Sequence, residues 1–198
     1  MYGVSIVTLV QYDRIDNLFL LKDMILDQTY FDKIKEWVII DGSFKKNDDM
    51  INQINKLQIQ IPIKIVFIEH EDGAKIGKLR NKVHTKAMYD IIVCCDDDDY
   101  YPPERVEEAY EKLINSDLLL AGCSPTFMYD YVLDKQFKFL QFWDNHSPNN
   151  SFAYKKEYLI NHSHDETVSN DEEISFTNKW TEKLIKLDSI KTVNISSH

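Results

Sequence analysis

Short apolar runs rich in β-branched residues alternate with segments of helical periodicity along the first two-thirds of the chain. The runs are Val4–Val10, Trp37–Ile40, Ile63–Ile68, Ile91–Cys95 and Leu118–Ala121. Each has the length of a strand, and near-continuous apolar character is typical of strands that are buried on both faces. Strands that alternate with helices predict a largely parallel sheet with helices on both faces. We therefore expect an α/β fold of the Rossmann-like kind.

Between these runs the apolar residues recur with the spacing of an α-helix. We expect Asp13 or Asp16 to cap the first helix and Pro103 to lie in the first turn of the fourth. The third helix should span residues 75–88. Apolar residues spaced by three or four should face the core; in the four helices they are Leu18, Leu21 and Ile25; Ile51, Ile54 and Leu57; Ile76, Leu79, Val83 and Ala87; and Val106, Ala109 and Leu113.

The pattern changes after Ser124. Residues 126–133 and 136–142 are rich in tyrosine and phenylalanine and are separated by Asp134-Lys135, which predicts a small antiparallel hairpin. Residues 171–184 have the pattern of a helix, and residues 191–196 that of a last strand. A chain of 198 residues is expected to form one domain.

Composition excludes several classes of partner. The chain has 23 Lys and Arg against 33 Asp and Glu, a net charge of −10, which disfavours a nucleic-acid surface and binding to anionic lipid. Three cysteines without metal-binding spacing are expected to be buried, reduced thiols in a cytoplasmic protein. We find no signal peptide, and no apolar run approaches the ~20 residues of a membrane span.

Four consecutive aspartates, Asp96, Asp97, Asp98 and Asp99, follow the fourth apolar run directly. Two carboxylates ~4 Å apart repel by ~4 kcal/mol at an effective dielectric of ~20, and a buried strand leaves them little room to splay into water. A bound cation removes this penalty. If the strand continued, Asp96 and Asp98 would share one face, and oxygen ligands favour Mg²⁺ or Mn²⁺. The alternative is a solvated acidic turn.

The polar residues that follow the other runs should meet this cluster. Ligands of parallel sheets bind beyond the carboxyl ends of the strands. Residues 11–14, 41–43 and 69–73 occupy that position and are polar or charged with few exceptions.

The order of these motifs resembles the GT-A fold glycosyltransferases, in particular family-2-like members. The resemblance rests on Asp41-Gly42-Ser43 after a strand, on Gly77-Lys78-x-Arg80-Asn81, on the aspartate cluster with Tyr100, and on Pro103-Glu104-Arg105-Val106. It covers about residues 2–125 closely and the rest loosely. It implies that residues 1–124 bind a nucleotide sugar and that residues 125–198 form the acceptor side.

The resemblance also implies roles for single residues. Asp41 would hydrogen-bond the nucleobase, and Asp98 would bind the metal directly, with Asp96 near both the ribose and the metal. Around these, the remaining residues expected to contact the nucleotide are Leu9, Val10, Tyr12, Gly77, Lys78, Arg80 and Asp97. For several of them the alternatives stay open: Asp41 as a turn former, Lys78 and Arg80 as solvated helix charges.

Members of this family use a late acidic residue as general base. Asp171 is the first candidate and Glu172 the second; Asn170 stands where an acid usually precedes the base. A helix N-terminus enriched in acids is the competing interpretation. Some relatives use a C-terminal histidine as a metal ligand, which makes His198 a candidate.

The implied reaction moves a sugar from a nucleotide-diphosphate sugar, in our expectation a UDP-sugar, to an acceptor hydroxyl with inversion. The short chain has little room for an acceptor domain, so a partner or a homodimer is expected to complete the site. Competing hypotheses are a catalytically inactive, metal-dependent module that binds nucleotide sugars or glycans and, less well supported, a haloacid-dehalogenase-like phosphatase, in which Asp-x-Asp also follows an apolar strand.

Overall fold

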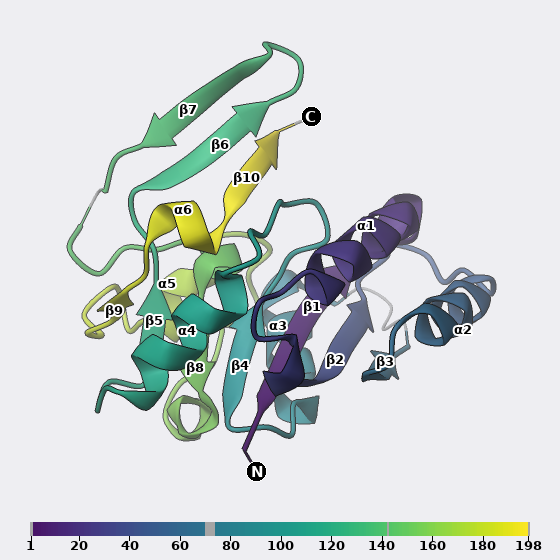
Figure 1. Cartoon of the computed structure of the whole chain (residues 1–198), viewed down its shortest axis with the longest axis horizontal. Coiled ribbons are helices and arrows are strands. Elements are labelled where there is room, and N and C mark those ends of the chain that lie inside the picture. Colours follow the sequence, from purple (N-terminus) through teal and green to yellow (C-terminus); the bar gives the residue numbers. More distant parts are fainter. Residues whose placement is uncertain (1, 70–73, 142, 198) are drawn as a thin grey trace.

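The central element is a seven-stranded sheet, which Figure 1 shows in a computed structural model that describes residues 2–69, 74–141 and 143–197. The strand order is β3-β2-β1-β4-β8-β5-β9. All strands run parallel except β8, which pairs antiparallel with both β4 and β5. The strands are β1 (Val4–Val10), β2 (Ile34–Asp41), β3 (Lys64–Ile68), β4 (Ile91–Cys94), β5 (Leu120–Gly122), β8 (Ala153–Lys155) and β9 (Ile185–Lys186).

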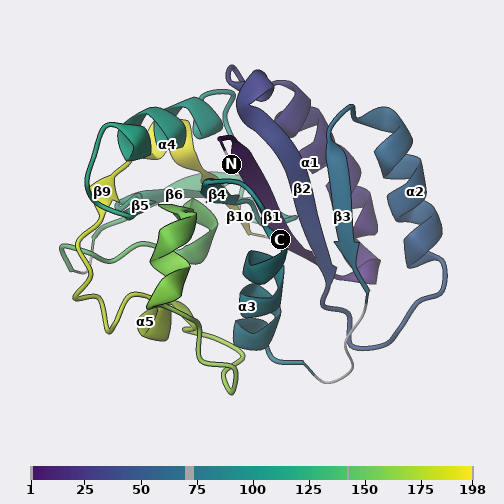
Figure 2. The same cartoon turned by 90° about the horizontal axis from the view of Figure 1, so that it is seen from below.

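Helices cover both faces of this sheet, as Figure 2 shows from below. One face carries α1 (Ile15–Leu26), α2 (Met50–Gln60) and α4 (Arg105–Ile114); the other carries α3 (Ile76–Lys86) and the short α5 (Glu173–Phe176). Short connecting elements are η1 (Tyr12–Arg14), η2 (Phe31–Lys33), η3 (Asn149–Ser151), η4 (Lys156–Ile160) and α6 (Ser189–Thr192).

The side chains of the strands point alternately to the two faces of the sheet and form a hydrophobic core on each face. In β2, Trp37 and Ile39 pack with α1, α2 and α4, whereas Val38 and Ile40 pack with α3. Successive side chains of a strand point to opposite faces, so a strand that is apolar at every position supplies both cores at once. The continuous apolar runs of the sequence are explained by this burial on both sides.

A second sheet stands above the first in Figure 1, in the order β10-β6-β7. Its strands are β6 (Thr126–Asp130), β7 (Lys135–Phe139) and β10 (Asn194–Ser197). The expected hairpin is confirmed as β6–β7, with a turn that begins earlier, at Tyr131. Tyr100 pairs with Asn194, which joins the end of the acidic segment to β10.

Several local expectations were wrong. Neither Asp13 nor Asp16 caps α1, whose N-cap is Arg14. In α2 the buried face contains Met50, Ile54 and Leu57, so Met50 takes the core position that was expected for Ile51, which is 41% exposed. Residues 171–184 form only the single turn of α5, because Asn178, Lys179 and Trp180 have positive φ. No helix in the described ranges is long and apolar enough to span a membrane.

Candidate functional site

A cavity of about 280 Å³ lies at the carboxyl ends of β1, β2 and β4. Parallel strands bring the residues that follow them to the same edge of the sheet, where ligands of such folds bind. α3 closes the cavity from the other side. The residues that line it are Leu9, Val10, Gln11, Arg14, Gly42, Phe44, Ala74, Ile76, Leu79, Arg80, Asp96, Asp97, Asp98 and Ser169.

The acidic segment leaves strand geometry as soon as β4 ends. Asp97 and Asp98 lie in a turn, so the strand does not continue into the cluster, and Asp96, Asp97 and Asp98 all line the cavity. The fourth aspartate, Asp99, instead accepts hydrogen bonds from Asn150 Nδ2 at 2.6 Å and from the backbone N of Ser196 at 2.9 Å. Three carboxylates therefore face the cavity, while the fourth holds the second sheet against the first.

Asp96 is held by Arg80 from α3. The guanidinium donates from Nη1 to Oδ1 at 2.7 Å and from Nη2 to Oδ2 at 3.1 Å. This bidentate geometry is the strong form of such a pair. Burial alone would lower the pKa of Arg80, but the Asp96 carboxylate outweighs it and raises that pKa above its usual value. Arg80 therefore stays charged and fixes Asp96 at the edge of the cavity.

Asp97 is the most constrained carboxylate of the cluster. Its side chain is 1% exposed, and its Oδ2 has no hydrogen-bond partner among the residues that the structure describes. Burial raises the pKa of Asp97 to about 8; Arg14 opposes the shift, and the neighbouring Asp98 and Asp96 carboxylates add to it. A buried oxygen without a partner is costly, and a cation beside it would remove that cost.

The cluster fits a divalent cation that is shared with a substrate. Within residues 2–69, 74–141 and 143–197, no three Asp, Glu, His or Cys side chains are placed to bind a metal ion on their own. Mg²⁺ is commonly held by one or two carboxylates together with substrate phosphates and water. Asp97 and Asp98 supply such a pair at the cavity. Both oxygens of Asp96 are held by the buried Arg80, whereas the arginine that contacts Asp97 and Asp98, Arg14, is partly exposed.

Comparison with known proteins gives the family. The model of "Glycosyl transferase family 2" matches residues 11–168, a range that contains the acidic cluster and all of the cavity lining except Leu9, Val10 and Ser169. The chain belongs to glycosyl transferase family 2. Membership of this family gives no support to the phosphatase alternative. A comparison with curated protein sequences finds no significant match.

Solved structures show the same GT-A fold. TarS from S. aureus (residues 1–349) has a TM-score of 0.71 and 16% identity over 98% of this chain and 60% of that one. The mannosyltransferase PcManGT from Pyrobaculum calidifontis, solved with GDP-Man and Mn²⁺, has a TM-score of 0.69 and 14% identity over 92% of this chain and 54% of that one. A TarS complex with UDP-GlcNAc scores 0.68 at 12% identity, over 99% of this chain and 59% of that one. The chain thus spans between half and two-thirds of these relatives.

Around this family-2 site, the predicted nucleobase residue is held rigidly. Asp41 ends β2 and is 1% exposed; it accepts from the backbone N of Ser43 at 2.9 Å and from the Ser43 hydroxyl. Ser43 Oγ in turn accepts from the backbone N of Tyr12 at 2.8 Å. Asp41 therefore locks two strand ends together, and it is Gly42 and Phe44 beside it that line the cavity.

The other predicted nucleotide contacts divide into two groups. Leu9, Val10 and Arg80 line the cavity. Gly77 instead lies against the backbone of residue 165, where a Cβ atom would come within 1.9 Å of the Asp165 carbonyl oxygen. Lys78 is half-buried on α3, next to Gly77 and outside the cavity lining. The motif around Gly77 thus includes a packing contact as well as a binding contact.

The two candidate bases have different environments. Asp171 is exposed with φ 55°, immediately before α5. Glu172 is 4% exposed, and its Oε1 lies 3.4 Å from Arg80 Nε. Arg80 thus connects Glu172 to Asp96, and Ser169, two residues before Asp171, lines the cavity. His198, the candidate metal ligand, lies outside the described residues.

Two further side chains belong to this site: Arg14, which lies in the segment 11–14 that the sequence places near the cluster, and Asn149, which sequence reasoning missed. Arg14 bonds Asp98 through Nη1 and lies 3.2 Å from Asp97 Oδ1 through Nη2. The Asn149 side-chain oxygen, in the amide orientation that satisfies its surroundings, accepts from Arg80 Nη1 at 2.9 Å. The position of Arg14 just after the first strand predicted its place near the cluster but not its contacts with Asp97 and Asp98. Asn149 carries no local signal, because η3 and β8 bring it there.

Proposed function

We propose that this chain transfers a sugar from a nucleotide-diphosphate sugar, such as a UDP-sugar, to an acceptor hydroxyl, and that the transfer depends on Mn²⁺ or Mg²⁺. The observation that supports this most is the cavity at the carboxyl ends of the strands. Three aspartates line it, and one of them, Asp97, has a buried oxygen that forms no hydrogen bond with any described residue. The Mn²⁺ and GDP-Man bound to one structural relative and the UDP-GlcNAc bound to another support this proposal.

Each group has a role in this mechanism. Asp97 and Asp98 would hold the cation, which neutralises charge that develops on the leaving diphosphate. Leu9, Val10 and Gly42 would form the wall for the base and ribose, and Arg80 would keep Asp96 in place. Asp171 would take the proton of the acceptor hydroxyl. A single base opposite the leaving group gives inversion at the anomeric carbon.

The acceptor would bind on the side of residues 125–198. The hairpin tip and the segment after it expose large apolar side chains: Tyr131, Val132, Leu133, Leu140 and Trp143. Exposed aromatic surfaces are suited to stacking against sugars or to apolar carriers. The same surface is where a second copy of the chain would dock if a homodimer completes the site.

Asp98→Asn should abolish cation-dependent binding of the donor. The measurement is calorimetric titration of UDP-GlcNAc and GDP-Man with and without Mn²⁺, followed by an assay of donor hydrolysis. Wild type should bind one donor at least tenfold more tightly with Mn²⁺, and the variant should lose that gain. Asp117→Asn is the matched control, because Asp117 is exposed just before β5, at the opposite edge of the sheet.

The same titration tests the non-catalytic alternative. A binding module would bind the donor with Mn²⁺ but release no free sugar or nucleoside diphosphate over hours. An enzyme releases both, because water replaces the acceptor slowly. Retention of Mn²⁺-dependent donor affinity by Asp98→Asn would refute the proposed site.

A further inference from the structure

Arg14 occupies the space between two carboxylates that the proposed cation needs. It ends η1, directly after β1, and its guanidinium bonds Asp98 Oδ2 through Nη1 and lies 3.2 Å from Asp97 Oδ1 through Nη2. One planar fork thus bridges both acids. These contacts leave Asp97 Oδ2 to a cation, but a divalent cation at the same two carboxylates would lie beside the guanidinium, and the two repel because they carry the same sign of charge.

We propose that Arg14 is a mobile counter-charge: it holds Asp97 and Asp98 in place of the cation, and it moves onto the donor diphosphate when cation and donor bind together. This inference rests on the proposed function of the site. Guanidinium geometry matches a phosphate as well as it matches a carboxylate, so the exchange gives Arg14 an equivalent partner.

The surroundings of Arg14 favour such an exchange. Its side chain is 37% exposed, whereas the Arg80 side chain that holds Asp96 is 5% exposed. Within the described part of the chain, Arg14 Nε and Asp97 Oδ2 are both buried without a hydrogen-bond partner, so neither member of the pair is fully hydrogen-bonded. All three residues, Arg14, Asp97 and Asp98, line the cavity, so a bound diphosphate would lie within reach.

A thermodynamic consequence follows. The cation alone must displace Arg14 without giving it a new partner, so it binds weakly. The diphosphate provides that partner, so cation and diphosphate each increase the affinity for the other by the same factor. Arg14 is therefore the residue that couples the two, and its removal should raise the affinity for the cation alone while lowering the coupling.

The test is a double titration by calorimetry. Mn²⁺ alone, nucleoside diphosphate alone (UDP or GDP, whichever wild type binds more tightly) and each in the presence of the other are titrated into wild type and Arg14→Gln. We expect Arg14→Gln to bind Mn²⁺ alone about tenfold more tightly, and the coupling factor to fall by roughly tenfold, in the usual range for coupled sites. Arg14→Lys, which keeps the charge without the bridging fork, should lie between them.

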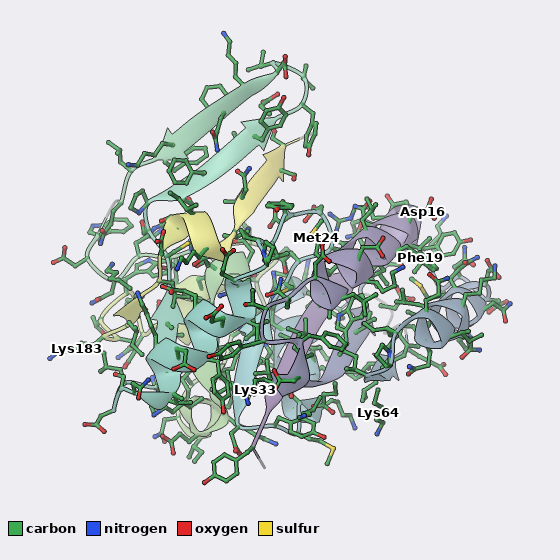
Figure 3. All side chains as sticks on the ribbon, in the orientation of Figure 1. Asp16, Phe19, Met24, Lys33, Lys64 and Lys183 are labelled. Atoms are coloured by element: carbon green, nitrogen blue, oxygen red, sulfur yellow. The ribbon has the colours of Figure 1, made fainter. Side chains whose placement is uncertain are left out.

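Lys183→Gln is the control for charge alone. It makes the same change of charge, and Figure 3 shows Lys183 at the opposite side of the molecule from Asp16, two residues after Arg14. An unchanged or weaker Mn²⁺ affinity in both Arg14 variants, with wild-type coupling, would overturn the inference and leave the proposed function intact. Absence of any nucleotide binding by wild type would instead overturn both.

Discussion

At the scale of single residues, the difference in burial between Asp171 and Glu172 indicates which of them is the general base and which positions other groups. Glu172 lies against Arg80 in the interior, which ties it to Asp96. Asp171 is exposed. A general base must reach the acceptor and exchange its proton with solvent, and a buried ion-paired carboxylate is suited to positioning instead.

Substitution separates these roles. Asp171→Asn should lower turnover 10²- to 10⁴-fold, as loss of a general base does, with donor affinity and melting temperature unchanged. Glu172→Gln should weaken donor binding and lower the melting temperature, because Arg80 loses a buried partner. Steady-state kinetics, calorimetry and thermal melts of both variants test these expectations. If the turnover of Asp171→Asn stays within threefold of wild type, Asp171 is not the general base.

At the scale of elements, the start of α3 is fixed by close contact with the segment around Asp165. Gly77 lies where a Cβ atom would be 1.9 Å from the Asp165 carbonyl oxygen and 2.8 Å from its carbonyl carbon. These are backbone atoms, so no side chain can rotate away. The contact holds α3, and hence Arg80, against the loop that leads to the candidate base.

Gly77→Ala should therefore destabilise the chain, although alanine is the better helix former by about 1 kcal/mol. Overpacking typically costs about 1–3 kcal/mol, which for a chain of this size lowers the melting temperature by about 2–10 °C. Thermal melts followed by circular dichroism measure it. Thr85→Ala, at an exposed position of the same helix, should change the melting temperature little; stabilisation by Gly77→Ala would contradict the packing shown here.

At the scale of the whole molecule, the core on the α3 side contains two buried histidines from distant parts of the chain. The ring centroids of His84 and His164 are 5.3 Å apart, and His164 stacks on Phe176 of α5. Burial, with the Arg80 charge, lowers the pKa of His164 to about 3, and burial, His164 and Arg80 lower that of His84 well below its usual value. Both rings are neutral in the folded chain.

Acid should consequently destabilise the fold through these rings. In the unfolded chain His164 becomes protonated below about pH 6.5, whereas in the folded chain it does so only near pH 3. The contribution of the neutral ring to the free energy of unfolding is therefore fully present above pH 6.5 and is lost as the pH falls toward 3. For His164 the loss at pH 4 is about 3 kcal/mol. Urea unfolding at pH 7.5 and 4.5 should show a smaller loss for His164→Asn than for wild type; an equal loss in both would contradict the assignment.

The sequence by itself determined the features that depend on local periodicity. β1 has the predicted bounds, the buried faces of α1 and α4 are the predicted ones, and the hairpin is present. The acidic cluster was found because charge directly after an apolar strand is costly unless something compensates it. Each of these sequence patterns lies within one helix or strand or directly beside it, so it can be recognised without knowing which other elements pack against it.

Only the tertiary structure decided how the cluster is used. β8 enters the sheet antiparallel between β4 and β5, and η3 before it brings Asn150 to Asp99. Arg80 forms an ion pair with Asp96. Arg14, which lies 84 positions before Asp98 in the sequence, contacts Asp97 and Asp98. These pairings join residues far apart in the chain, so their geometry comes from sheet order and packing, which no local pattern of residues encodes.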